Sequence, residues 1–129
     1  MPAHSTTNSG RMTSNARRVI VATLAAALPF GALAHHGWSE YDSTTLLTLT
    51  GTIEEAGYEH PHGYVKLKTP AKTWVAVLAP PSRMDNRGLS REALKVGATA
   101  TVVGYPNRNK AKEMRAERIT VGGKTVELR

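Results

Sequence analysis

The sequence predicts an all-β domain with one short helix, built as an OB-fold-like small Greek-key barrel. Two observations support this prediction. Apolar and polar residues alternate with a period of two in several short segments after residue 46, which is typical of half-buried strands. The expected order is three strands, a short helix, and two or three further strands, which is the order of an OB-fold. An open β-sandwich is the alternative, because this pattern does not show whether the sheet closes.

The strands are expected wherever alternation or an apolar run lies between turn residues. Gly51 interrupts the first strand and indicates a bulge or a close approach of another backbone. The third strand is nearly all apolar and is expected to be buried on both faces until Pro80 and Pro81 end it. Gly122 and Gly123 predict a two-residue hairpin between the last two strands. The expected strands span residues 47–54, 64–68, 73–79, 98–105, 117–121 and 124–128.

The helix is expected to begin near Leu89. Ser90 is a suitable N-terminal cap, and Glu92 has the favourable sign for a first turn. Leu89 and Leu94 have the spacing of a hydrophobic staple, and Gly97 is expected to end the segment.

Residues 108–118 form a run rich in basic side chains, expected between the fourth and fifth strands. Loops at this position bind ligands in many OB-folds. The acidic residues Glu113 and Glu117 offset part of the charge, so a solvated hairpin is the favoured interpretation.

Residues 1–34 have the pattern of a cleavable secretory signal. Arg11, Arg17 and Arg18 precede an apolar stretch at 19–33, and Ala32 and Ala34 provide the small residues of a cleavage site. The stretch is shorter than the roughly 20 apolar residues of a membrane-spanning helix, so no membrane span is expected after cleavage. Arg17 and Arg18 leave twin-arginine export open beside ordinary secretion. We therefore expect a periplasmic protein whose single domain covers residues 35–129.

Composition limits the function classes. Loss of the signal lowers the net charge from +7 to +4, which argues against nucleic acid as a partner. The chain has no cysteine, which excludes disulfides, thiol chemistry and cysteine-based zinc sites. Because the sequence has none of the nucleophile, phosphate-binding or metalloprotease motifs, we expect a binding module and not an enzyme.

Four histidines are the candidate metal ligands. Cleavage after Ala34 would make His35 the first residue, so its amine and imidazole can chelate one ion, with His36 beside them. His60 and His62 flank Pro61, which favours an extended conformation, and residues two apart in such a segment point to one side.

Nitrogen ligands of this kind suit copper first, with zinc or nickel next. Glu40, Asp42 or Glu59 would complete or orient the set. Transition-metal binding is therefore the first functional hypothesis. The alternative is a structural or interaction module that binds an envelope protein or a glycan without metal.

The same segments resemble a family of small exported proteins of Gram-negative bacteria, catalogued as a domain of unknown function. Residues 35–42 (HHGWSEYD) are similar to its A-H-H-x-[FW]-x-x-[FY]-D opening, and residues 49–53 (LTGTI) to its L-x-G-T-V strand. Residues 60–62 (HPH) stand where the family has N-P-H, and residues 104–106 (GYP) match its G-x-P. The resemblance implies an exported OB-like barrel and gives His36 and His62 more weight than His60.

Overall fold

The structure is a computed structural model, and it describes residues 2–4, 10 and 37–129. The apolar part of the predicted signal, its cleavage site, and both His35 and His36 lie outside the described residues. The signal and the domain boundary at His35 therefore stay predictions.

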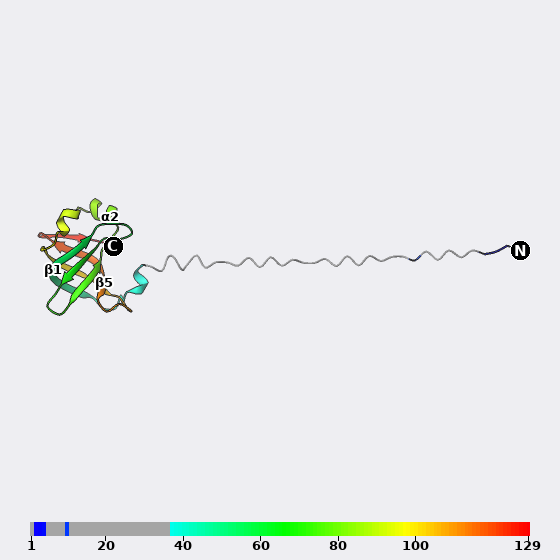
Figure 1. The fold of residues 1–129 in the computed structure, drawn as a ribbon, viewed down its shortest axis with the longest axis horizontal. Helices are drawn as coiled ribbons and strands as arrows, with labels where there is room; N and C mark the ends of the chain where they lie inside the picture. Colours follow the sequence, from blue (N-terminus) through cyan, green and yellow to red (C-terminus); the bar gives the residue numbers. More distant parts are fainter. Residues whose placement is uncertain (1, 5–9, 11–36) are drawn as a thin grey trace.

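The described domain consists of short strands with helical turns before β1 and between β3 and β4 (Figure 1). The strands are β1 Leu47–Gly57, β2 Tyr64–Lys68, β3 Thr73–Val77, β4 Thr99–Pro106, β5 Glu113–Val121 and β6 Lys124–Glu127. The helical segments are η1 Trp38–Glu40, α2 Pro81–Asn86 and η2 Arg91–Leu94, of which η1 and η2 are 3-10 turns.

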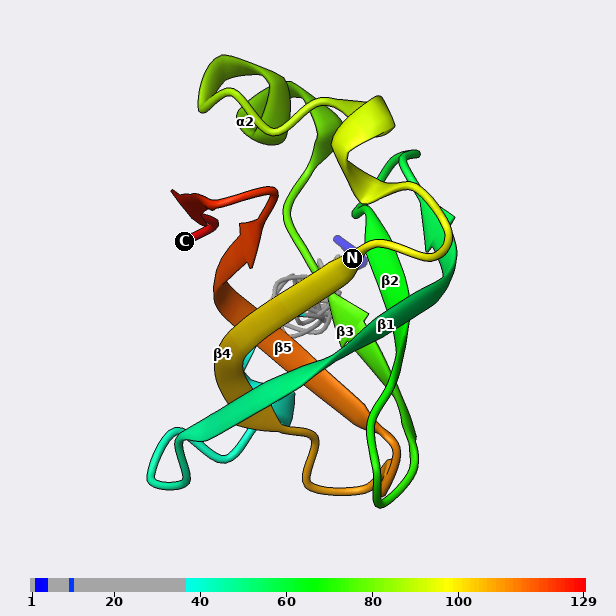
Figure 2. The ribbon, with the colours of Figure 1, turned by 90° about the vertical axis from the view of Figure 1, so that its left-hand side faces the viewer.

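Strands β1 to β5 close into a barrel. The sheet order is β3-β2-β1-β4-β5-β6, and an additional parallel pairing of β3 with β5 joins the two sides of the sheet. Figure 2 shows β1, β4 and β5 crossing the barrel obliquely, with α2 over one end. Closure confirms the predicted OB-like barrel and excludes the open β-sandwich. It also pairs edges that a cysteine-free sheet would otherwise expose.

The alternating apolar residues form the core, as the sequence predicts. Ile53, Val65 and Leu67 are fully buried. Leu47 and Leu49, at the beginning of β1, are half-buried and pack against the core. The largest other side chains with almost no exposure are Leu78, Met84, Leu89, Leu94, Val102, Met114, Ile119 and Leu128.

Gly51 marks a close approach and not a bulge. A Cβ at Gly51 would collide with the carbonyl oxygen of Lys68 in β2, so only glycine lets the strands approach so closely there. The register shift of β1 instead lies between Ile53 and Glu55. The predicted hairpin is confirmed, because Gly122 and Gly123 both have positive φ, the conformation of a tight two-residue turn.

The helix expected near Leu89 is only partly correct. Residues Arg91–Leu94 form a single 3-10 turn, and Ser90 precedes it without a side-chain capping hydrogen bond. The α-helix lies earlier, at Pro81–Asn86, because proline is well suited to the first turn of a helix, where its missing N–H has no partner to lose. Tyr58 ties both turns to the barrel: its hydroxyl lies 2.6 Å from the carbonyl oxygen of Leu89 and 2.8 Å from Asp85 Oδ1.

Two strand predictions are corrected. The third strand is not buried on both faces, since four of its five residues are half-buried and only Ala76 is buried. The fifth strand begins at Glu113, four residues earlier than expected. The second half of the basic run is therefore a strand and not a solvated hairpin, and Met114, Arg115 and Ala116 within it are all buried.

Of the residues that the structure describes, none form a helix with the length and apolar character needed to cross a membrane.

Candidate functional site

A buried arginine lies on the outside of the barrel wall. Met114 and Ala116 point into the core, so the side chain of Arg115 between them points to the opposite face of β5. Arg115 pairs with Val77 in β3 and with Tyr105 in β4, at the seam where the barrel closes. Although it faces outward, Arg115 is only 6% exposed.

Trp38 covers this arginine. The Cζ atom of Arg115 lies 4.8 Å from the ring centroid of Trp38, and the Cζ atom of Arg129 lies 4.7 Å from the same centroid. Tyr105 meets the indole edge to face at 6.0 Å. The tryptophan is therefore the centre of a cluster of two guanidinium groups and one phenol. The quadrupole of the indole ring attracts both guanidinium cations.

Backbone hydrogen bonds hold the η1 segment in this position. The N–H of Asp42 donates to the carbonyl oxygen of Pro106 at 2.9 Å, and the N–H of Arg108 donates to the carbonyl oxygen of Glu40 at 2.9 Å. Tyr41 forms an isolated bridge with Asn107. These bonds attach the chain before β1 to the end of β4, so Trp38 is placed over β5 by the backbone as well as by its own contacts.

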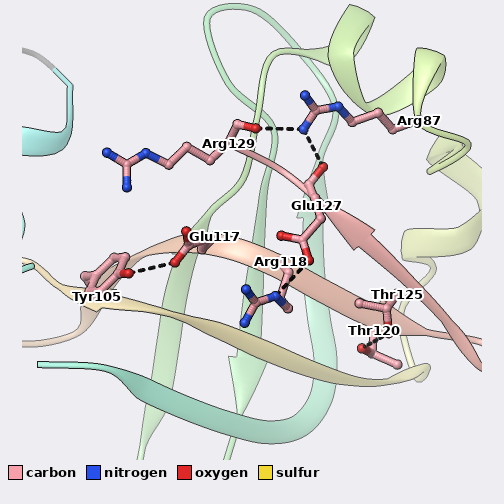
Figure 3. A network of polar contacts seen from close by, with 8 residues as sticks. All are labelled: Arg87, Tyr105, Glu117, Arg118, Thr120, Thr125, Glu127 and Arg129. Atoms are coloured by element: carbon pink, nitrogen blue, oxygen red, sulfur yellow. Dashed lines mark hydrogen bonds and ion pairs between the residues drawn. The ribbon is translucent and has the colours of Figure 1, made fainter.

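The carboxylates that flank Arg115 on β5 bind other groups. Glu113 Oε2 accepts hydrogen bonds from the Tyr41 hydroxyl at 3.1 Å and from the Asn107 amide at 2.8 Å. Glu117 Oε2 accepts one from the Tyr105 hydroxyl at 2.7 Å, and Figure 3 shows these two side chains pointing toward each other.

The guanidinium of Arg115 has a buried nitrogen without a partner. Its Nε is the one buried side-chain nitrogen or oxygen of the described residues that makes no hydrogen bond. Burial lowers the pKa of Arg115, and the positive charge of Arg83 lowers it further. An unpaired donor of this kind costs free energy unless a further group satisfies it.

His62, one of the predicted ligands, is electrostatically coupled to this cluster. It is half-buried in the segment between β1 and β2, and its pKa is lowered by burial first and then by the charges of Arg115 and Arg83. The same region therefore combines a half-buried imidazole with two nearby guanidinium groups. Such a set of donors is chemically suited to a carboxylate, phosphate or sulfate group.

The remaining predicted residues lie elsewhere. His60 is exposed at a bend of the chain, two residues before the half-buried His62. Asp42 closes a turn: hydrogen bonds from Thr44 and then from Thr45 lower its pKa to about 2. Within the described part of the chain, no three histidine, aspartate or glutamate side chains gather as a metal site would require. The predicted set of His35, His36, His60 and His62 is not tested by this, because two of the four lie outside that part.

Comparison with known proteins identifies a family but no activity. A family model described as "Family of unknown function (DUF6152)" matches residues 22–115. Comparison with curated proteins gives no match. Among solved structures, a chain from the crystal structure of a complex of TiaS with tRNA and ATP is similar, with a TM-score of 0.47 and 19% identity. The similarity covers 68% of this chain and 19% of that one, so this chain spans about a fifth of its length.

Proposed function

The chain belongs to the family of unknown function (DUF6152), and we propose that it is an exported binding module that holds an anionic group at Arg115. The observation that carries this proposal is the buried, unpartnered Nε of Arg115. The ligand group would be a carboxylate, a phosphate or a sulfate. Periplasmic location is part of the proposal and rests on the secretory pattern of residues 1–34.

The charges around Arg115 favour an anion over a cation. Arg83 and His62 lie close enough for electrostatic coupling to Arg115, and Arg129 shares the face of Trp38. The flanking Glu113 and Glu117 already accept hydrogen bonds from tyrosines. An anion at the Arg115 guanidinium would satisfy the free donor and reduce the repulsion between Arg115 and Arg83.

Calorimetric titration with sodium sulfate tests the proposal, with sodium chloride of equal ionic strength as the reference. Sulfate has no titration of its own near neutral pH. The unaltered protein should bind sulfate, and Arg115→Gln should reduce the affinity at least tenfold, because it removes a charge-assisted bond worth about 1.5–3 kcal/mol. Arg83→Gln should weaken binding less.

Arg118→Gln is the matched control. Arg118 lies on the same strand, but it is paired with Glu127 at 2.9 Å (Figure 3). Equal sulfate binding by the unaltered protein and Arg115→Gln would contradict the proposal. If Arg115→Gln does not fold, the sulfate affinities of Arg83→Gln and Arg115→Lys are compared with that of the unaltered protein instead, and both should be lower.

Transition-metal binding is the second candidate function. The ligand set is His35, His36, His62 and His60, with copper as the first metal. His62 is the half-buried member of the described pair. The nearby guanidinium groups oppose a cation, so the two candidates predict opposite effects of removing Arg115.

A further inference from the structure

A cleft lies outside the Arg115 cluster. This cleft of about 620 Å³ lies between η2 and the sheet, within the roughly 300–1,000 Å³ typical of small-molecule sites. Buried Ala100 and Val121 line it, and the exposed Glu92 and Lys95 of the η2 region stand beside them. Added Cβ atoms at Gly122 and Gly123 would meet nothing within 4 Å, so the hairpin turn leaves this side of the cleft open.

Threonines form a row that leads into this cleft. Thr50 pairs with Thr101, Thr101 with Thr120, and Thr120 with Thr125, so the row crosses β1, β4, β5 and β6. The hydroxyl oxygens of Thr50 and Thr101 are 2.8 Å apart, and those of Thr120 and Thr125 are 2.7 Å apart (Figure 3). Thr101 and Thr120 line the cleft together with Thr99.

These hydroxyls can both donate and accept hydrogen bonds. A hydroxyl has one proton and two lone pairs, and each paired contact uses one proton, so every pair retains one proton and free lone pairs. The lining adds one carboxylate at Glu92 and one ammonium group at Lys95, whose charges cancel. Donors and acceptors without net charge match a polyhydroxylated ring better than an ion or an apolar ligand.

We propose that this cleft binds a neutral sugar unit of a glycan. The hydroxyls of Thr99, Thr101 and Thr120 would hydrogen-bond the sugar hydroxyls together with Glu92, whereas Ala100 and Val121 between them point into the core. The site is separate from the Arg115 cluster, because Thr120 lies five residues along β5 from Arg115, roughly 16 Å in a strand. The two sites can therefore be tested independently.

The test is a titration of the ¹⁵N-labelled purified protein with two neutral probes, chitotetraose and maltotetraose, followed by amide chemical shifts. At least one probe should shift the amides of residues 92–101 and 120–123 and leave those around Arg115 in place. Thr101→Val and Thr120→Val should each weaken the affinity by roughly three- to tenfold, the effect of losing one hydrogen bond.

Thr48→Val is the control, because Thr48 is exposed on the same face of β1 as Thr50 but does not line the cleft. Thermal unfolding of each variant checks that the fold is kept. The proposal is overturned if neither probe shifts the cleft amides at concentrations up to about 10 mM. Such a concentration exceeds the Kd of about 1 mM that a weak site would have. The proposal is equally overturned if Thr48→Val weakens binding as much as Thr101→Val does.

Discussion

The guanidinium of Arg115 in β5 stacks against the indole of Trp38, with 4.8 Å between the Cζ atom and the ring centroid. This contact joins the first described turn of the chain to the seam that closes the barrel. It explains how a charged side chain on the outer face of a strand is only 6% exposed. It also places one of the two tryptophans where it can report on the occupancy of the site.

Core burial predicts a clear difference between two leucines. Leu67→Ala should lower the free energy of unfolding by about 2–5 kcal/mol, because Leu67 is fully buried in the barrel. Leu49→Ala should lower the free energy of unfolding by less, since Leu49 is only half-buried near the beginning of β1. Urea unfolding measures both, with the exposed Thr50→Ala as the control. A larger loss for Leu49→Ala would mean that the core is centred elsewhere.

Tyr58→Phe tests the link between the barrel and its helical turns. The substitution removes the hydroxyl that contacts Leu89 and Asp85 and keeps the ring. We expect a loss of about 1–3 kcal/mol in unfolding free energy, because the buried carbonyl oxygen of Leu89 loses its donor. Tyr64→Phe is the matched control, since its hydroxyl makes one exposed contact of 3.3 Å with Glu55. Equal losses for the two variants would contradict the assigned role of Tyr58.

Alkaline pH should destabilise the domain through two tyrosines. Burial, followed by the charge of Glu113, raises the pKa of Tyr41 to about 12, and burial with the hydrogen bond to Asp85 raises that of Tyr58 to about 12. The unfolded chain loses these protons near pH 10, so their stabilising effect is complete below pH 10 and is lost as the pH rises to 12. Urea unfolding across this range should show a falling free energy, and Tyr41→Phe should make the fall shallower. An unchanged slope in Tyr41→Phe would contradict the burial of this hydroxyl.

The alternation of apolar residues predicts the strands, whereas closure of the barrel depends on the pairing of β3 with β5. Ile53, Val65 and Leu67 recur with a period of two, and burial against one core is the physical cause of that period. The strand that carries the site was harder to identify, because charged Glu113, Arg115 and Glu117 alternate with Met114 and Ala116 in a run that composition alone makes polar.

The site itself depends on contacts between distant parts of the chain. The sequence indicates His62 by its ligand chemistry, and in the structure the charge of Arg115 acts on this histidine. The sequence does not indicate Arg115, because nothing local shows that Trp38 packs on that guanidinium. The α2 turn was missed for a different reason: Pro81 reads as the end of a strand, yet proline also begins helices.

Removing the charge of Arg115 should change the affinity for a metal ion and the affinity for an anion in opposite directions. Copper binding through His35, His36 and His62 should become tighter in Arg115→Gln, because a nearby positive charge is removed, whereas sulfate binding should be lost. One added alanine before His35 should abolish most of the copper affinity by converting the terminal amine to an amide. Calorimetry with Cu(II) on these forms measures both effects. Weaker copper binding in Arg115→Gln would contradict this assignment of charges.

The most direct test of the proposed anion site uses Trp38 as a fluorescent reporter. In a Trp74→Phe background, Trp38 is the remaining tryptophan of the chain and lies against Arg115. Sodium sulfate should change its emission along a saturable curve, beyond the change with sodium chloride of equal ionic strength, and Arg115→Lys should shift that curve to higher concentration. Identical responses to the two salts, or a sulfate curve that Arg115→Lys leaves unchanged, would contradict the central claim that this arginine holds an anion.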